Sequence, residues 1–153
     1  MKHIFILNPN AGHGTAAKVL EEKLSSTEFD WQLYTTTAPG DSVRFIREWC
    51  DNHAEPVRFY ACGGDGTINK VATGINGFPN ASMSVLPFGS GNDYVKYYGG
   101  KTRFFDPEAL CAAAEESIDL ILFDLDGTIV DSVGAIAACA NDCLMEKGLK
   151  PQP

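Results

Sequence analysis

Short apolar segments alternate with helix-like segments along the first part of the chain, and this alternation restricts the fold more than any other feature. Four short runs rich in apolar and β-branched residues predict strands at His3–Leu7, Trp31–Thr36, Val57–Ala61 and Met83–Leu86. Apolar residues at helical spacing predict three helices between them: Thr15–Leu24, a helix from Asp41 through Trp49, and Thr67–Ile75. Such alternation is typical of a parallel sheet with helices on both faces. The sequence therefore predicts an α/β fold of three layers with a mostly parallel, Rossmann-like sheet.

The pattern changes in the last part of the chain. The alanine-rich segment Glu108–Glu116 predicts a helix, and the near-continuous apolar run Ile118–Phe123 predicts a strand. Ser132 is placed to cap a further helix that continues through Leu144. We therefore expect a short strand–helix tail after the main sheet.

Glycine-bearing loops follow three of the predicted strands, at Asn8–Gly14, Gly63–Thr67 and Gly89–Gly91. In an open parallel sheet, ligands bind at the carboxyl ends of the strands, where such loops gather. Glycine lets backbone N–H groups approach an anion closely, and the N-terminus of a following helix adds a favourable dipole. Three such loops in register predict a site for a nucleotide triphosphate.

Composition and charge narrow the choice of partners. The chain has 153 residues, of which 44% are hydrophobic, which is enough for one domain of ordinary size. Its net charge is −8 and it has no cluster of Lys and Arg, which argues against a nucleic-acid partner. The same charge gives the chain no attraction to an anionic membrane.

The cysteine and hydropathy patterns indicate a soluble, cytoplasmic protein. The 5 cysteines lack metal-type C-x-x-C spacing, and Cys139 and Cys143, on a predicted helix, are interpreted as small buried residues. An odd number of cysteines without a secretory signal indicates a reducing compartment. No segment approaches the ~18 apolar residues of a membrane span, although the sequence leaves open peripheral contact with a membrane and formation of a homo-oligomer.

Three motifs resemble the catalytic domain of diacylglycerol kinases, a family that includes bacterial lipid kinases and sphingosine kinases. They are the loop Asn8-Pro9-Asn10-Ala11-Gly12, the Gly-Gly-Asp-Gly-Thr-x-Asn segment Gly63–Asn69, and the segment Leu86–Tyr94. The resemblance covers about residues 1–118, which we assign as an ATP-binding domain with a phosphofructokinase-like nucleotide-binding fold. It implies transfer of the ATP γ-phosphate to a lipid hydroxyl, for example that of diacylglycerol, with Mg²⁺ as a cofactor.

The resemblance also implies which residues contact the nucleotide: Thr36, Gly63, Gly64, Asp65, Gly66, Thr67, Ile68, Asn69 and Ser90. Thr36 is preferred over its two threonine neighbours by its spacing from the Gly40-Asp41 turn, and Ser90 keeps the hydroxyl of the family's threonine. Asp65 has two interpretations. It orients the loop or the magnesium shell, or it caps the helix that follows Gly66.

Two departures from the family pattern bear on activity. Lys70 stands where the family usually has Glu, and it is either a solvated side chain or a partner for a phosphate. The family's second, mostly β domain, which supplies the general base and carboxylates tied to magnesium, is missing from the pattern. Because phosphoryl transfer depends on positioning and charge neutralisation, we expect little or no catalysis by this chain alone.

The segment Phe123–Ser132 resembles the nucleophile loop of haloacid dehalogenase-type phosphatases, particularly the phosphoglycolate phosphatase-like group. We assign residues 119–153 as the truncated start of such an enzyme. The resemblance implies that Asp124 is the nucleophile and Asp126 the acid and base, both at a Mg²⁺ ion. Asp131 is interpreted as a capping acid and not as a ligand. The other groups that this family needs lie well downstream, so we expect no phosphatase activity from the tail alone.

Three hypotheses for the function follow from these motifs. The first is the nucleotide-binding domain of a lipid kinase. The second is a phosphatase fragment in which the kinase-like region is only a carrier. The third is a non-catalytic module that binds a nucleotide or a partner, with its missing domain supplied by another chain.

Overall fold

The computed structural model describes residues 1–25, 27–90 and 92–117. The chain divides into two units, Met1–Ile118 and Asp119–Pro153, and the described residues belong to the first. The predictions made for the tail therefore lie outside the described residues; they comprise the strand Ile118–Phe123, the helix from Ser132, the cysteines Cys139 and Cys143, and the candidate phosphatase residues Asp124 and Asp126.

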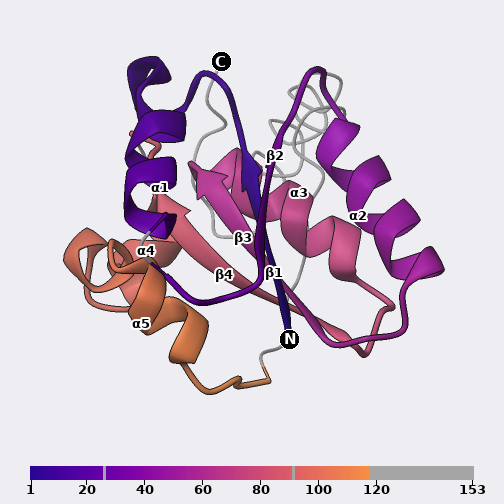
Figure 1. Ribbon diagram of the computed structural model, residues 1–153. Helices are drawn as coiled ribbons and strands as arrows, with labels where there is room; N and C mark the ends of the chain where they lie inside the picture. The colour runs from indigo at the N-terminus through magenta and orange to yellow at the C-terminus, as the bar shows by residue number, and fades with distance from the viewer. Residues whose placement is uncertain (26, 91, 118–153) are drawn as a thin grey trace, which may run out of the picture. The chain divides into compact units, whose positions relative to one another are not determined.

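Four parallel strands form one sheet in the order β2-β1-β3-β4 (Figure 1). Their bounds are Lys2–Leu7 for β1, Trp31–Thr35 for β2, Val57–Gly63 for β3 and Ala81–Pro87 for β4. Ile6 pairs with Tyr34 of β2 on one side and with Ala61 of β3 on the other. The predicted α/β fold with a parallel sheet is confirmed.

Helices cover both faces of this sheet and make three layers. One face carries α1 (Ala16–Leu24) and α5 (Pro107–Ala112), and the other carries α2 (Asp41–Asn52) and α3 (Asp65–Ile75) (Figure 1). Alternate residues of β1 enter the two apolar cores: Ile4 and Ile6 on the α2 and α3 side, Phe5 and Leu7 on the α1 and α5 side. Strands buried on both faces read as continuous apolar runs, which is why the sequence pattern located them well.

Three short elements complete the described domain: the 3₁₀ turns η1 (Ala11–Gly14) and η2 (Lys101–Phe104), and the helix α4 (Asp93–Tyr97). None of them was predicted, because each is shorter than the window in which hydrophobic periodicity can be recognised. Between α4 and η2, Gly99 and Gly100 both have positive φ angles, which reverse the chain.

The alanine-rich helix predicted over Glu108–Glu116 is wrong in its second half, because α5 ends at Ala112. The buried guanidinium of Arg58 donates to the carbonyl of Leu110 over 2.7 Å and to that of Cys111 over 3.4 Å, both in the last turn of the helix. Arg58 also pairs with Glu115 at 3.2 Å, and that carboxylate accepts from the hydroxyl of Ser82 on β4. These tertiary contacts hold the segment after α5 in a non-helical conformation, which local helix propensity does not anticipate.

All helices of the described domain are short. The longest of those described, α2, has 12 residues, whereas a bilayer requires about 20 apolar residues in a helix. Within the described ranges, no helix has the length and apolar character needed to cross a membrane.

Helices α2 and α3 pack closely because α3 has glycine at their contact. A Cβ atom on Gly74 would lie 3.0 Å from three carbons of the Ile46 side chain. Beside this contact, Arg47 of α2 donates to the carbonyl of Thr73 over 3.2 Å. Gly66, in the first turn of α3, has no heavy atom within 4 Å of the corresponding position.

We predict opposite effects for alanine at these two glycines of one helix. Gly74→Ala should lower the free energy of unfolding by about 1–2 kcal/mol. The new methyl group overlaps Ile46 and forces α2 and α3 apart, and this overpacking costs more free energy than the higher helix propensity of alanine provides. Gly66→Ala should raise it by about 0.5 kcal/mol, because alanine restricts the unfolded chain without a clash. Urea unfolding of both variants measures the difference, and a change of the same sign in both would contradict this account of the packing.

Candidate nucleotide-binding site

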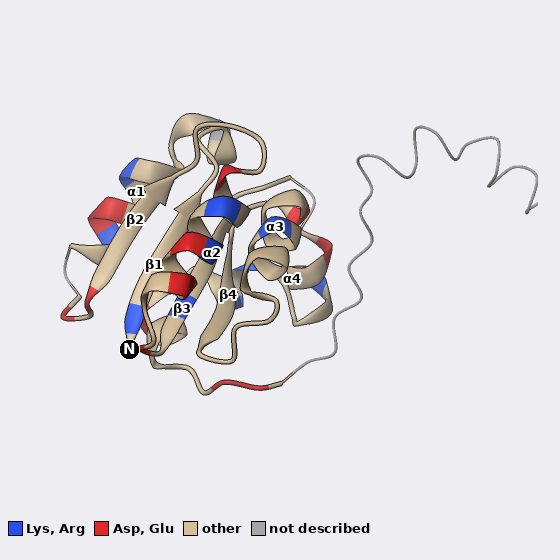
Figure 2. Cartoon of the chain, turned by 90° about the vertical axis from the view of Figure 1, so that its right-hand side faces the viewer, with Lys and Arg blue, Asp and Glu red and all other residues tan. Residues whose placement is uncertain are grey.

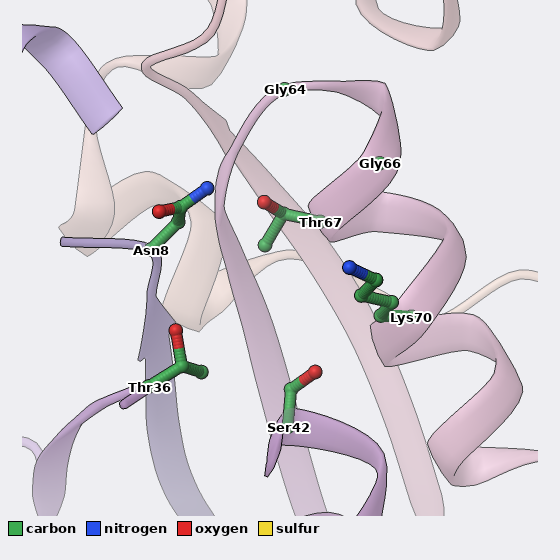
Figure 3. Close-up of a pocket in the computed structure, with 7 residues that line it drawn as sticks. All are labelled: Asn8, Thr36, Ser42, Gly64, Gly66, Thr67 and Lys70. Carbon is green, nitrogen blue, oxygen red and sulfur yellow. The ribbon is translucent and has the colours of Figure 1, made fainter. Parts of the chain in front are cut away.

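A cavity of about 220 Å³ opens at the carboxyl ends of β1, β2 and β3 (Figure 3). It is lined by residues from the strand ends and from the two helices α2 and α3: Asn8, Thr36, Ser42, Gly64, Gly66, Thr67 and Lys70. In the strand order, β1 lies between β2 and β3, so the chain leaves β1 toward one side of the sheet and later continues on the other. Such a switch point is where open parallel sheets bind ligands.

The loops after β1 and β2 are held by backbone hydrogen bonds that place Asn8 and Thr36 on the cavity. The amide of Asn8 donates to the carbonyl of Cys62 over 3.2 Å. The amide and the hydroxyl of Thr36 both donate to the carbonyl of Leu7, over 2.9 and 3.2 Å. Thr36 therefore lies beside the glycine turn that follows β3, although the two are far apart in sequence.

Asp41 organises the turn between β2 and α2. Its buried carboxylate accepts hydrogen bonds from the Thr37 amide at 2.9 Å, from the Tyr34 hydroxyl at 3.0 Å and from Arg44 at 2.5 Å. These contacts, the Thr37 amide first, lower the pKa of Asp41 to about 2, so the carboxylate is ionised at neutral pH. Gly40 is the N-cap of α2, and the Asp41 side chain bonds back to Tyr34 of β2 and does not cap the helix.

The turn after β3 places the start of α3 against the cavity. The helix begins at Asp65, two residues before the predicted start at Thr67, and Gly64 is its N-cap. The amides of Thr67 and Ile68 donate to the Gly64 carbonyl over 2.9 and 3.1 Å. Gly66 and Thr67 therefore face the cavity from the first turn of a helix, where the helix dipole favours an anion.

This turn lies directly against the glycine loop that follows β4. The amide of Gly89 donates to the carbonyl of Gly63 over 3.0 Å. A Cβ atom on Gly89 would lie 2.7 Å from the Gly64 nitrogen and closer still to the Gly64 Cα. Glycine at position 89 is thus required by contact between two loops, and its presence alone does not show contact with a ligand.

Asp65 joins the same two loops through a side chain. Its carboxylate accepts from the amide of Asp93 over 2.8 Å, at the start of α4. The fully buried Asn92, in the left-handed region at φ 62°, donates to the carbonyl of Gly89. The Lys101 ammonium reaches the same carbonyl over 3.0 Å. The Asp65 side chain thus links the two loops, and it does not cap the helix α3 that begins at this residue.

Four of the nine residues that the sequence implicated line the cavity, namely Thr36, Gly64, Gly66 and Thr67. The others lie around it. Gly63 and Asp65 support the turn, and the side chain of Ile68 is buried in the core. Asn69 accepts from the Thr73 hydroxyl one turn later, and Ser90 is exposed beyond β4.

Asn8 and Ser42 were not predicted from the sequence as contact residues, and Lys70 was predicted to be either solvated or a partner for a phosphate. Ser42 could have been found from the Gly40-Asp41 turn, which places the next residue in the first turn of α2. Lys70 follows Thr67 by three residues, so helical geometry places the two on one face. Among the described residues, no group of three or more His, Cys, Asp or Glu side chains could hold a metal ion.

Proteins similar to this chain include several named as lipid kinases or diacylglycerol kinases. A family model described as diacylglycerol kinase catalytic domain matches residues 2–123. A protein named "Probable lipid kinase YegS-like" from Klebsiella pneumoniae is 33% identical over 97 residues, which are 63% of this chain and 32% of the relative. A diacylglycerol kinase from Bacillus subtilis is 31% identical over 98 residues, which are 61% of this chain and 32% of the relative. The chain thus spans about a third of the length of these curated relatives.

A solved structure shares the fold. The crystal structure of a diacylglycerol kinase from Bacillus anthracis aligns with a TM-score of 0.57 and 23% sequence identity, covering 72% of this chain and 38% of the other. The family match to residue 123 also extends past residue 118, where the sequence analysis placed the end of the kinase-like region.

We predict that an added methyl group destabilises the contact between the two glycine loops strongly at position 89 and only weakly at position 64. Gly89→Ala should lower the free energy of unfolding by about 2–3 kcal/mol, because its Cβ would overlap the Gly64 backbone. Gly64→Ala should cost less than about 1 kcal/mol, because its Cβ would meet the Gly89 Cα at 3.3 Å. Thermal unfolding compares the two variants, and equal losses would show that the loops do not touch as described.

Proposed function

Because the chain belongs to the diacylglycerol kinase catalytic-domain family, we propose that residues 1–118 form the ATP-binding domain of a lipid kinase. The observation that carries this proposal is the cavity at the switch point of the sheet, which joins a glycine turn, a helix N-terminus and three hydroxyl side chains. These are the groups that hold phosphate oxygens in parallel α/β proteins.

In this proposal different residues of the cavity contact different parts of a triphosphate. The hydroxyls of Thr36, Ser42 and Thr67 donate to phosphate oxygens, and Gly66 lets the ligand approach the backbone of α3 closely. Asp65 acts on the site through the Asp93 amide, because it fixes the glycine turn against the loop after β4. The expected nucleotide contacts of Asn69 and Ser90 remain part of the proposal, for a nucleotide that extends beyond the cavity.

Mg²⁺ is proposed as the counter-ion of the nucleotide. Since the described residues contain no cluster of three or more acidic, His or Cys side chains, the ion would take its ligands mainly from the triphosphate and water. When bound, it neutralises charge on the phosphates.

The reaction proposed for the whole enzyme moves the terminal phosphoryl group of ATP to a lipid hydroxyl. The bond from the γ-phosphorus to the bridging oxygen breaks, a bond to the lipid oxygen forms, and the hydroxyl proton passes to a base. The residues lining the described cavity include no Asp, Glu or His that could serve as that base. We therefore propose that this domain binds and orients ATP, and that the base and the lipid-binding surface come from outside residues 1–118.

We predict that ATP binding and stability respond to different glycines of α3. Gly66→Ala should weaken ATP binding at least about tenfold without loss of stability, because its methyl group occupies space at the phosphate-binding turn. Gly74→Ala lies outside the cavity and should leave the affinity unchanged below its unfolding temperature. Calorimetry with Mg²⁺ tests both, and absence of saturable ATP binding by the folded wild-type chain would refute the proposal.

For residues 119–153 we propose the start of a haloacid dehalogenase-like strand and helix, on the strength of the Asp124-Leu125-Asp126-Gly127-Thr128 motif. In that proposal Asp124 is the nucleophile and Asp126 the general acid and base. Two carboxylates do not complete such a site, since a serine or threonine, a lysine and further acidic groups are also implied by the resemblance.

We predict that the purified chain with Mg²⁺ hydrolyses p-nitrophenyl phosphate no faster than buffer, and that Asp124→Asn changes nothing. Hydrolysis that depends on Mg²⁺ and disappears in Asp124→Asn would instead favour the phosphatase hypothesis. Release of nitrophenolate is followed by absorbance, with heat-denatured chain as the blank.

A further inference from the structure

Lys70 is the one charged residue among those that line the described cavity. The other lining residues offer hydroxyl groups, an amide and glycine backbone. The whole chain has a net charge of −8, and acidic and basic residues are interspersed over the helices (Figure 2). The negative net charge of the chain repels anions, and Lys70 places a positive charge at the cavity that attracts them.

Helix geometry directs Lys70 toward the phosphate-binding turn. Lys70 follows Gly66 by four residues and Thr67 by three, so all three lie on one face of α3. Side chains on a helix lean toward its N-terminus, and Figure 3 shows the Lys70 ammonium turned toward Thr67 and the cavity. The ammonium and the first turn of the helix therefore line the same cavity.

Nothing in the described fold uses this charge. Within the ranges that the structure describes, Lys70 forms no ion pair, whereas Lys18, Lys96 and Arg44 each pair with an acid three or four residues away. The nearby acid of α3, Asp65, is bonded to the Asp93 amide. A cation that leans over the positive end of a helix is also mildly unfavourable. The position of Lys70 thus contributes little to stability.

We propose that Lys70 makes the cavity selective for polyphosphates over monophosphates. The ammonium donates to an oxygen of the outer phosphates, while the hydroxyls and the glycine turn hold the rest of the chain of phosphates. This inference rests on the proposed function, because it assigns the ligand of the same cavity. It goes beyond that function by naming the residue that distinguishes ATP from AMP.

The selectivity follows from simple electrostatics. Each additional phosphate brings more negative charge to the cavity, so a cation at its wall gains more from ATP than from ADP, and least from AMP. Lysine presents a compact point charge with three donors, which suits a phosphate oxygen without demanding a fixed planar geometry. Since the side chain is exposed, salt should weaken its contribution.

The test compares binding of ATP, ADP, AMP and inorganic tripolyphosphate to four forms of the full chain by calorimetry, at low and at high salt. The forms are wild type, Lys70→Gln, Lys70→Arg and the control Lys18→Gln, which removes the same charge from an exposed site on α1. Lys70→Gln should weaken ATP and tripolyphosphate about tenfold at low salt and AMP less than about twofold. Lys70→Arg should retain most of the affinity, and Lys18→Gln should match wild type. Thermal unfolding of Lys70→Gln should be unchanged.

The possible outcomes separate this inference from the proposed function. If wild type binds ATP and Lys70→Gln binds it equally well, or loses AMP and ATP alike, the inference is wrong and the nucleotide site stands. If tripolyphosphate binds through Lys70 and ATP does not bind, the anion site stands and the nucleotide proposal fails. If neither binds to the folded wild-type chain, both are overturned.

Discussion

The approach of the Gly64 backbone to that of Gly89 is the constraint on which the binding edge of this domain depends. A side chain at position 89 would overlap Gly64, so the turn after β3 and the loop after β4 can meet only if position 89 is glycine. The hydrogen bond from Gly89 to Gly63 and the bond from the Asp93 amide to Asp65 then hold the two loops as a single layer. This layer fixes the first turn of α3, and through it one wall of the cavity.

Much of the fold could be predicted from the sequence, because the central strands β1 and β3 are buried on both faces and appear as near-continuous apolar runs. All four described strands and the three long helices lie where the pattern placed them, within a few residues. The prediction failed where tertiary contacts overrule local preference. Alanine-rich sequence favours a helix beyond Ala112, but Arg58 binds the last carbonyls of α5 and Glu115 together. The short helix α4 was missed because five residues are too few to show a period.

The site was predictable to the extent that motifs mark strand ends. The glycine turn and Thr36 were placed correctly on one edge, because parallel strands bring their carboxyl ends together. Which side chains line the cavity depends on helix rotation, and a motif does not contain that information. Ile68 belongs to the same motif as Thr67, yet it faces the core. Ser42 belongs to no motif and lines the cavity because the bonds of Asp41 set the start of α2.

The clasp that Arg58 forms with α5 and Glu115 determines where the polypeptide leaves the described domain. Arg58 is the second residue of β3, and its partner Ser82 is the second residue of β4, so the clasp lies at the amino ends of the strands. The cavity lies at the carboxyl ends. At about 3.3 Å per residue, the 7 residues of β3 separate the two by roughly 20 Å. Any connection from the clasp to the ligand-binding edge must therefore be at least about six extended residues long, which sets a minimum length for linkers in fusions or domain exchanges made at this point.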